Sequence, residues 1–215
     1  MTDLSCLFEL RETEPRFLER ELRSRGCRFL AGTDEVGRGC LAGPVVAAAV
    51  ILPEFHAIEG IKDSKLLSPA QREKLYGEIT EQAVAWGVGV IGVSEIDRIN
   101  IFHASLKAMS EAVGKLKPSP DFLLIDGKHK IPFAVAQRPV VKGDRHCESI
   151  AAASIVAKVS RDRMMAEFER EYPNFTFSVH KGYPTEKHRE ELREHGPLPI
   201  HRRSFNLLGT IGGDE

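Results

Sequence analysis

The sequence predicts an α/β domain in which helices pack on a mixed β-sheet. After residue 27, strand-like segments come first and then alternate with helical segments, an order typical of such a sheet. One segment, 44–52, is apolar without interruption, as expected for a strand covered on both faces. The chain has 215 residues, of which 42% are hydrophobic and 28% charged. It can therefore bury a core, and its composition is neither disordered nor fibrous.

Five segments have the composition of strands, and we expect them in one sheet: 28–36, 44–52, 87–93, 122–125 and 133–141. The last of these segments is interrupted by Pro139. Because proline cannot donate to a β-ladder, this segment is expected at an edge of the sheet.

The first predicted helix of the central region follows Ser68-Pro69-Ala70-Gln71, a capping box with proline in the first turn. Helical spacing of apolar residues continues from there up to Trp86. Ser94 is expected to cap the next helix, which ends before residues 117–120. Its apolar stripe, with spacings of three and four, is Ile99, Phe102, Leu106, Met109 and Val113.

A long helix follows residue 144 and ends at Pro173. The residues expected on its buried face are Ile150, Ala153, Ala157 and Met164. Thr185 is expected to cap a last, polar helix that stops at Gly196-Pro197. Near the N-terminus, residues 4–25 are predicted to form short helices divided by Pro15.

The net charge of −1 and the pI of about 6.7 exclude a globally basic nucleic-acid binder. A local basic face remains one explanation for the cationic residues of the last third, and a solvated mixed surface is the other. These residues are Arg138, Lys142, Arg145, Lys158, Arg161, Arg163, Lys181, Lys187, Arg189, Arg202 and Arg203. The four cysteines form no CxxC pair and are expected to be free thiols in a reducing cytosol.

Four acidic residues lie at the ends of predicted strands. Asp34 and Glu35 end the first strand, Asp126 ends the fourth, and Asp144 follows the fifth. If these strands are neighbours, the carboxylates converge, and clustered oxygen ligands favour Mg²⁺ or Mn²⁺. Taken singly, Asp126 before Gly127 is explained equally well as a turn former, and Asp144 as a helix cap. A charged pair inside an apolar strand is harder to explain structurally, although adjacent strand residues point to opposite faces.

Three polar segments are candidates for substrate contacts. Gly37-Arg38-Gly39 lets backbone amides approach a ligand closely, and Arg38 offers a planar fork for phosphate; a tight turn with an exposed arginine is the alternative. Asp63-Ser64-Lys65 precedes a helix start, where Ser64 and Lys65 either hold a phosphate or lie in a solvated loop. Tyr183, in the loop 180–185, either stacks on a sugar or base or packs on its own domain.

Taken together and in order, these segments resemble the type 2 ribonuclease H family. The stretch from Gly32 to Val45, GTDEVGRGCLAGPV, closely resembles the family signature. Further blocks resemble it in the same order: DSKLLS at 63–68, LIDG at 124–127, KGD at 142–144, HKGYPT at 180–185 and HRRSF at 201–205. The resemblance runs from about residue 28 to 205 and leaves out the N-terminal segment and the tail.

The resemblance implies a ribonuclease H-like fold: a mixed five-stranded central sheet flanked by helices, with a C-terminal helical extension. It implies a metal site of Asp34, Glu35, Asp126 and Asp144 that holds two Mn²⁺ or Mg²⁺ ions. The Gly37-Arg38-Gly39 backbone would sense a ribose 2′-hydroxyl, and Tyr183 would pack on the deoxyribose that follows. A related type 3 enzyme has GKG in this turn and a longer N-terminal domain, so the arginine favours type 2.

The expected activity is hydrolysis of the RNA strand of RNA–DNA hybrids, and cleavage 5′ of single ribonucleotides in duplex DNA. The products would carry 5′-phosphate and 3′-hydroxyl ends. We expect a cytoplasmic monomer without membrane contact, made of an N-terminal helical extension (1–27), a catalytic domain with its C-terminal helical part (28–205) and a tail (206–215). A DNA-directed nuclease or strand transferase of the same fold is one rival, and a non-catalytic hybrid-binding module is another.

Overall fold

The computed structural model describes residues 16–209 and contains one five-stranded sheet. Its strands are β1 (Leu30–Val36), β2 (Val45–Ile51), β3 (Ala85–Ile91), β4 (Phe122–Asp126) and β5 (Ala136–Val140). The helices are α1 (Phe17–Ser24), η2 (Ser64–Leu66), α2 (Pro69–Gln82), α3 (Val93–Gly114), α4 (Gly143–His146), α5 (Glu148–Glu171), α6 (Phe177–His180) and α7 (Glu186–His195). All five predicted strands are confirmed, with bounds that differ by a few residues.

The sheet is mixed, in the order β3-β2-β1-β4-β5. The meander β1-β2-β3 is antiparallel, whereas β4 and β5 run parallel to β1. β5, which contains Pro139, forms an edge of the sheet, as its proline predicted. The two parallel strands β1 and β4 lie side by side at the centre, so their carboxyl ends meet at the same edge.

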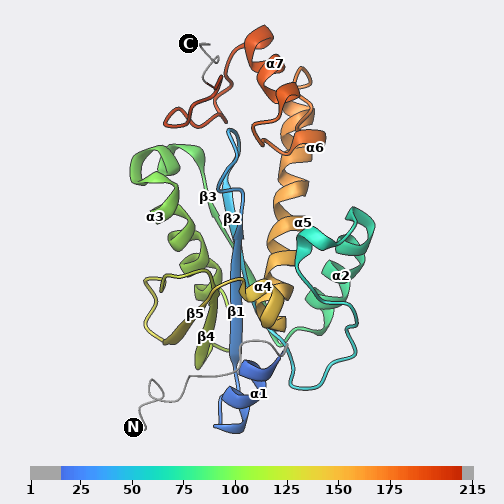
Figure 1. Cartoon of the computed structure of the whole chain (residues 1–215), viewed down its shortest axis with the longest axis vertical. Helices are drawn as coiled ribbons and strands as arrows, with labels where there is room; N and C mark the ends of the chain where they lie inside the picture. The colour runs from blue at the N-terminus through green and yellow to red at the C-terminus, as the bar shows by residue number, and fades with distance from the viewer. Residues whose placement is uncertain (1–15, 210–215) are drawn as a thin grey trace, which may run out of the picture.

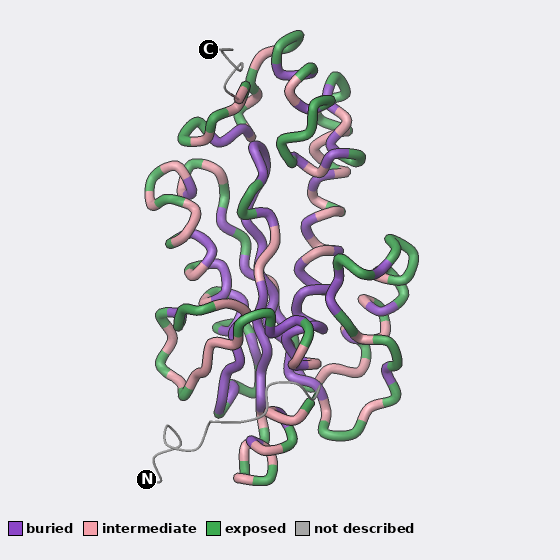
Figure 2. The backbone as a smooth tube through the Cα atoms, in the orientation of Figure 1, coloured by how far each residue is buried: buried purple, intermediate pink, exposed green. Residues whose placement is uncertain are grey.

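Helices cover both faces of the sheet (Figure 1). On one face α3 packs over residues such as Ala31, Ala47 and Leu123. On the other face α5 and α2 pack over Ala48 and Val50. The strands β1, β2 and β4 are therefore buried along most of their length (Figure 2), whereas the edge strand β5 is buried at none of its positions. β2 is buried at every position, which accounts for its uninterrupted apolar sequence.

The C-terminal part extends beyond one end of the sheet (Figure 1). There the last turns of α5 meet α6 and α7 around a small separate core that includes Met165, Phe175 and Phe177. Leu41 and Ala42, from the segment between β1 and β2, also belong to this core and join it to the sheet. Thr185 caps α7 as predicted, since its side chain accepts a hydrogen bond from the backbone N–H of His188.

The predicted helix boundaries in the middle of the chain are wrong by several residues. α2 begins with the expected capping box at Ser68 but ends at Gln82, and Trp86 lies in β3. α3 begins at Val93 after Gly92, so Ser94 is not its cap. The helix is kinked at Asn100, whose φ is 64° and whose Oδ1 accepts hydrogen bonds from two following backbone N–H groups. Asn100 thus caps the second part of α3.

One buried position of α5 also differs from the prediction. Ile150, Ala153 and Ala157 are fully buried as expected, but the buried methionine is Met165 rather than Met164. Steps of four from Ala153 reach Ala157, residue 161 and Met165, so the predicted face drifted by one residue at its end.

Several further expectations concern the ends of the chain and its surface. The predicted helix around residues 16–25 is confirmed as α1, whereas Pro15 and the residues before it lie outside the described residues, as do 210–215. Cys27, Cys40 and Cys147 are free thiols, and Cys6 is not described. Between residues 16 and 209 no helix is long and apolar enough to cross a membrane.

Candidate active site

The strand β1 carries two of the four predicted acids at its carboxyl end. Asp34 shares the α5 face of the sheet with Gly32 and is buried, with 7% of its surface exposed. The adjacent Glu35 belongs to the other face, but β1 ends one residue later and Gly37 turns the chain with a φ of +93°. Glu35 is only half-buried at this strand end, and its N–H donates to Asp34 Oδ1 at 2.7 Å.

The other two acids come from the neighbouring parallel strands. β4 pairs with β1 up to Thr33 and Ile125, so the next residues, Asp34 and Asp126, lie level at adjacent strand ends. Asp126 Oδ1 accepts a hydrogen bond of 2.7 Å from the N–H of Gly143. This bond ties Asp126 to the first turn of α4, where the buried Asp144 is the next residue.

Burial and neighbouring negative charges raise the pKa values of Asp34, Asp126 and Asp144. Burial raises the pKa of Asp34 well above its ordinary value, and the charges of Glu35, Asp126 and Asp144 raise it further. Burial also raises the pKa of Asp126, with Glu35 adding to the shift against the opposing N–H of Gly143. The pKa of Asp144 is raised by burial and by the charges of Asp126 and Asp63. The structure thus brings all four predicted acids together.

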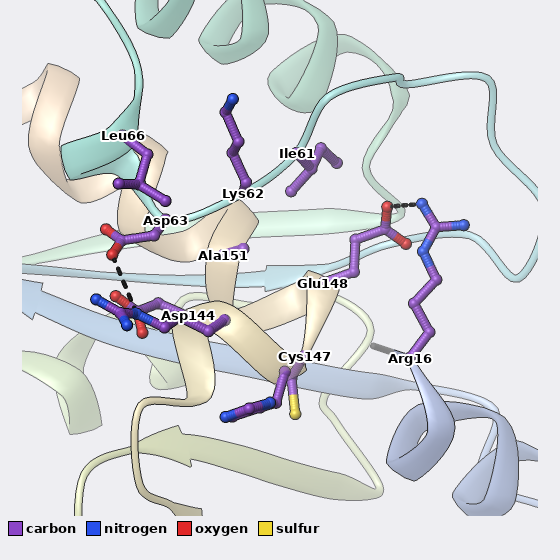
Figure 3. A pocket seen from close by; sticks show the side chains of 11 residues that line it. Arg16, Ile61, Lys62, Asp63, Leu66, Asp144, Cys147, Glu148 and Ala151 are labelled. Atoms are coloured by element: carbon purple, nitrogen blue, oxygen red, sulfur yellow. Dashed lines mark hydrogen bonds and ion pairs between the residues drawn. The ribbon is translucent and has the colours of Figure 1, made fainter. Parts of the chain in front are cut away.

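The four carboxylates do not form a closed cage. In the described part of the chain, no three side chains of the metal-ligating types are arranged as a ready-made metal site. Glu35 instead pairs with Arg38 at 3.0 Å, and Asp144 lies 3.8 Å from Lys65 Nζ. A cavity of about 410 Å³ borders Asp144 together with Asp63 and Glu148, as Figure 3 shows, while the other three site acids lie outside its lining.

The turn Gly37-Arg38-Gly39 follows β1 directly and lies next to Tyr183. The N–H of Leu41 donates to the carbonyl of Gly182 at 2.7 Å, which holds the two segments together. Burial raises the pKa of Tyr183, and the neighbouring Cys40 thiol raises it further. Tyr183 retains 36% of its surface exposed. A loop tyrosine and a turn about 145 residues apart in sequence (183 against 37–39) are therefore neighbours.

The segment Asp63-Ser64-Lys65 reaches the site from the other side. Asp63 is buried, and its Oδ1 accepts from the N–H of Lys65, which starts the short helix η2. Ser64 is buried against Ser154, whereas the Lys65 side chain is 82% exposed beside Asp144. Arg145 lies 3.7 Å from Asp63. Lys65 is thus placed at the carboxylates, and Ser64 serves packing in this structure.

Two site residues were missed by sequence reasoning. Arg161 and Arg202, which the sequence analysis assigned either to a basic face or to a solvated mixed surface, are instead fully buried behind the turn 37–39. For Arg161 a signal existed, because it lies four residues after Ala157 on the buried face of α5. No pattern in the sequence distinguishes Arg202 from its exposed neighbour Arg203.

Comparison with known proteins identifies the family. The family model described as Ribonuclease HII matches residues 31–208. Ribonuclease HII of Solibacter usitatus is 52% identical over 188 residues, which cover 87% of this chain and 82% of that protein. The crystal structure of ribonuclease H2 from Pyrococcus horikoshii superposes with a TM-score of 0.69 at 28% identity, covering 83% of this chain and 94% of that one.

A more distant structure, Bst-RNase HIII in complex with Mn²⁺, shares the fold. Its TM-score is 0.67 at 20% identity, with 85% of this chain and 68% of that chain covered. The family model matches most of the sequence, and the sequence identity to a family member exceeds 50%, so the relationship rests on sequence as well as on fold. The chain belongs to the ribonuclease HII family of hydrolytic endoribonucleases, which act on the RNA of RNA–DNA hybrids.

Proposed function

We propose that this enzyme cuts hybrids, and also single ribonucleotides embedded in duplex DNA, at a site built from Asp34, Glu35, Asp126 and Asp144. The cut would fall 5′ of the ribonucleotide and leave 5′-phosphate and 3′-hydroxyl ends. The observation that carries the proposal is the convergence of the four carboxylates, three of which raise the pKa of the fourth, Asp34.

The donor set fits divalent cations. Four mutually repelling carboxylates are stable as anions only when positive charge compensates them, and hard oxygen donors match Mg²⁺ or Mn²⁺. Mn²⁺ is the ion in the Bst-RNase HIII structure. When bound, two such ions would supply the charge that activates a water molecule and stabilises the leaving oxygen. We propose that Asp34, Glu35, Asp126 and Asp144 hold them.

The chain's own residues prepare this site in three ways. The N–H groups of Glu35 and Gly143 orient the carboxylates of Asp34 and Asp126. Arg38 neutralises Glu35 in the absence of cations, and would be released toward a substrate phosphate when Glu35 binds a cation. The exposed Lys65 beside Asp144 would contact the phosphate backbone, with Ser64 positioning its loop.

Sugar recognition would come from two neighbouring elements. The amides of Gly37-Arg38-Gly39 would contact the ribose 2′-hydroxyl, because glycine leaves room for the approach. The Tyr183 ring would pack on the following deoxyribose, and its exposed surface and its position beside Cys40 support this role. A 2′-hydroxyl on that second sugar would make the fit worse.

The test compares a DNA duplex that contains one ribonucleotide with a continuous hybrid, each end-labelled so that the cut can be mapped. Tyr183→Ala should slow cleavage at the embedded ribonucleotide by roughly tenfold or more relative to the hybrid. Tyr183→Phe is the matched control and should retain the wild-type ratio, because the ring rather than the hydroxyl packs on the sugar. Equal slowing of both substrates by Tyr183→Ala would assign the tyrosine to packing.

The same substrates separate the rival functions. A DNA-directed nuclease would cut an all-DNA duplex as well, and a binding module would turn over neither substrate at any Mg²⁺ or Mn²⁺ concentration. We further propose that the enzyme acts in the cytoplasm, which agrees with the free thiols of Cys27, Cys40 and Cys147. We also propose that it acts as a monomer, which sedimentation velocity would check.

A further inference from the structure

The two buried arginines behind the active site donate their hydrogen bonds to backbone carbonyl oxygens. Arg161 donates to Pro44 and Ala42 at 3.0 Å and to Lys181 at 2.8 Å. Both arginine side chains are fully buried. A buried cation is costly unless its donors are all paired, and replacing it by an apolar side chain would leave the carbonyls that it binds without a partner. Their presence therefore calls for a role beyond filling space.

Arg202 holds the turn that follows β1. Its guanidinium donates to the carbonyls of Gly37 at 2.7 Å, Arg38 at 3.0 Å and Gly43 at 2.9 Å. In a trans peptide the carbonyl and the next N–H point in opposite directions. Because the carbonyls of Gly37 and Arg38 point at Arg202, the N–H groups of Arg38 and Gly39 point away from it. Within residues 16–209 neither of these two N–H groups has a hydrogen-bond partner.

Arg161 joins this turn to the tyrosine loop. Its bond to the Lys181 carbonyl lies two residues before Tyr183, and its guanidinium carbon lies 6.0 Å from the centre of the Tyr183 ring. It also runs directly beneath the turn, since a Cβ added at Gly37 would lie 2.9 Å from Arg161 Cδ and closer still to Nε. A single side chain on the rigid helix α5 thus contacts both elements.

We propose that Arg202 and Arg161 are positioning residues for sugar recognition. Arg202 sets the direction of the two free amides of the turn 37–39, and Arg161 sets the distance between that turn and Tyr183. The inference rests on the proposed function, in which these two elements read the ribose and the next deoxyribose. Neither arginine contacts the substrate in this scheme.

The test uses a rate ratio that partial unfolding cannot change. A continuous hybrid presents a 2′-hydroxyl at every position, so that a misaligned turn can find another register. An embedded ribonucleotide presents only one. Misalignment should therefore lower the ratio of embedded-ribonucleotide cleavage to hybrid cleavage, whereas a loss of folded enzyme lowers both rates equally.

The variants are Arg161→Lys and Arg202→Lys. Lysine keeps the charge but cannot present the planar fork that reaches three carbonyls at once. We expect each to lower the ratio by about tenfold, as small misplacements of reacting groups do. Arg170→Lys and Arg203→Lys are matched controls, since they change exposed arginines on the same two segments. Both should leave the ratio within about twofold of wild type.

The outcomes separate this inference from the function on which it rests. If Tyr183→Ala leaves the ratio unchanged, the sugar-reading function itself is wrong. If Tyr183→Ala lowers the ratio and both arginine variants leave it at the wild-type value, the arginines only support the fold and the inference is overturned. A double variant, Arg161→Lys with Tyr183→Ala, gives a second readout. Its ratio of embedded-ribonucleotide to hybrid cleavage should be no lower than that of Tyr183→Ala alone, because Arg161 acts through the tyrosine. Additive losses in the double variant would contradict this coupling.

Discussion

Gly32 is a point of close approach between β1 and α5, and Gly32→Ala should separate the two. A Cβ at this position would lie 2.6 Å from the carbonyl oxygen of Ser149, and closer still to the backbone atoms Ser149 C and Ile150 N. Ordinary van der Waals contact begins at 3.4 Å, so the overlap is at least 0.8 Å. No side chain can rotate to relieve it, because the colliding atoms are the backbone of α5.

The cost follows from what has to move. Extra methyl groups in a packed core cost about 1–3 kcal/mol when side chains can adjust, and more when backbone must shift. Since α5 must move as a unit away from β1, we expect the free energy of unfolding to fall by about 3 kcal/mol or more. For a domain of this size that corresponds to a loss of roughly 6–12 °C in Tm. Asp34 lies two residues further along the same face, so cleavage should also slow at temperatures where the variant is folded.

Urea unfolding at 25 °C measures this change, and Gly77→Ala is the matched control. Gly77 lies on the exposed side of α2 with nothing within 4 Å of an added Cβ. The same substitution there should raise stability by about 0.5–1 kcal/mol, because alanine favours a helix. If Gly32→Ala lies within about 1 kcal/mol of wild type, the close packing of α5 on β1 is not the constraint described here.

Three further predictions concern the site, the substrate and the pH. Asp34→Asn should abolish cleavage at saturating Mg²⁺. The free energy of unfolding should stay equal or rise, because the variant removes a buried charge that three carboxylates repel. Near-normal turnover would rule out this metal site. Hybrid binding should weaken with salt despite the net charge of −1, with log affinity falling against log salt by about −0.9 for each phosphate contact. A cavity of about 580 Å³ between α2, α5 and α6 carries an excess of cations, because Arg72, Lys158, Arg163 and Lys181 line it against Glu73 and Asp162. A flat salt response would contradict binding through these cations. Burial lowers the pKa of His188 and His201 from 6.5 to about 4. Between pH 6.5 and about 4 the unfolded chain therefore binds more protons than the folded one, and the free energy of unfolding should fall as the pH drops through this window. The loss should be roughly 3 kcal/mol for each histidine that must be protonated. Urea unfolding at pH 7 and 4.5 measures it, and a His188→Gln variant that retains the full pH dependence would refute the assignment.

Local chemistry determined much of this protein. The uninterrupted apolar run of β2, the capping box at Ser68, the cap at Thr185 and the edge position of Pro139 each follow from a rule that acts over a few residues. The resemblance to a known family was equally local, because it rested on short ordered motifs. For these reasons the sheet and its edge were predictable before any coordinates, and the four acids could be named as candidates.

Boundaries and the use of individual residues were less predictable. The kink at Asn100 divides α3, and of the predicted apolar stripe only Met109 and Val113 are buried, although the capping tendency of asparagine was a signal for the kink. The exchange of Met164 for Met165 reflects the drift of a helical face over about four turns. Both errors arise because periodicity reports an average direction and not the packing at one position.

Only the tertiary structure decided how distant segments meet. Strand order places Asp34 and Asp126 at adjacent strand ends, and the bond from Gly143 brings α4 and its acid to them. Arg161 looks like any helix cation in the sequence, yet it is buried beneath a turn more than 100 residues away. The physical reason is that a cation is buried only where several hydrogen-bond acceptors converge on it, and such convergence is a property of the folded chain and not of any segment of it.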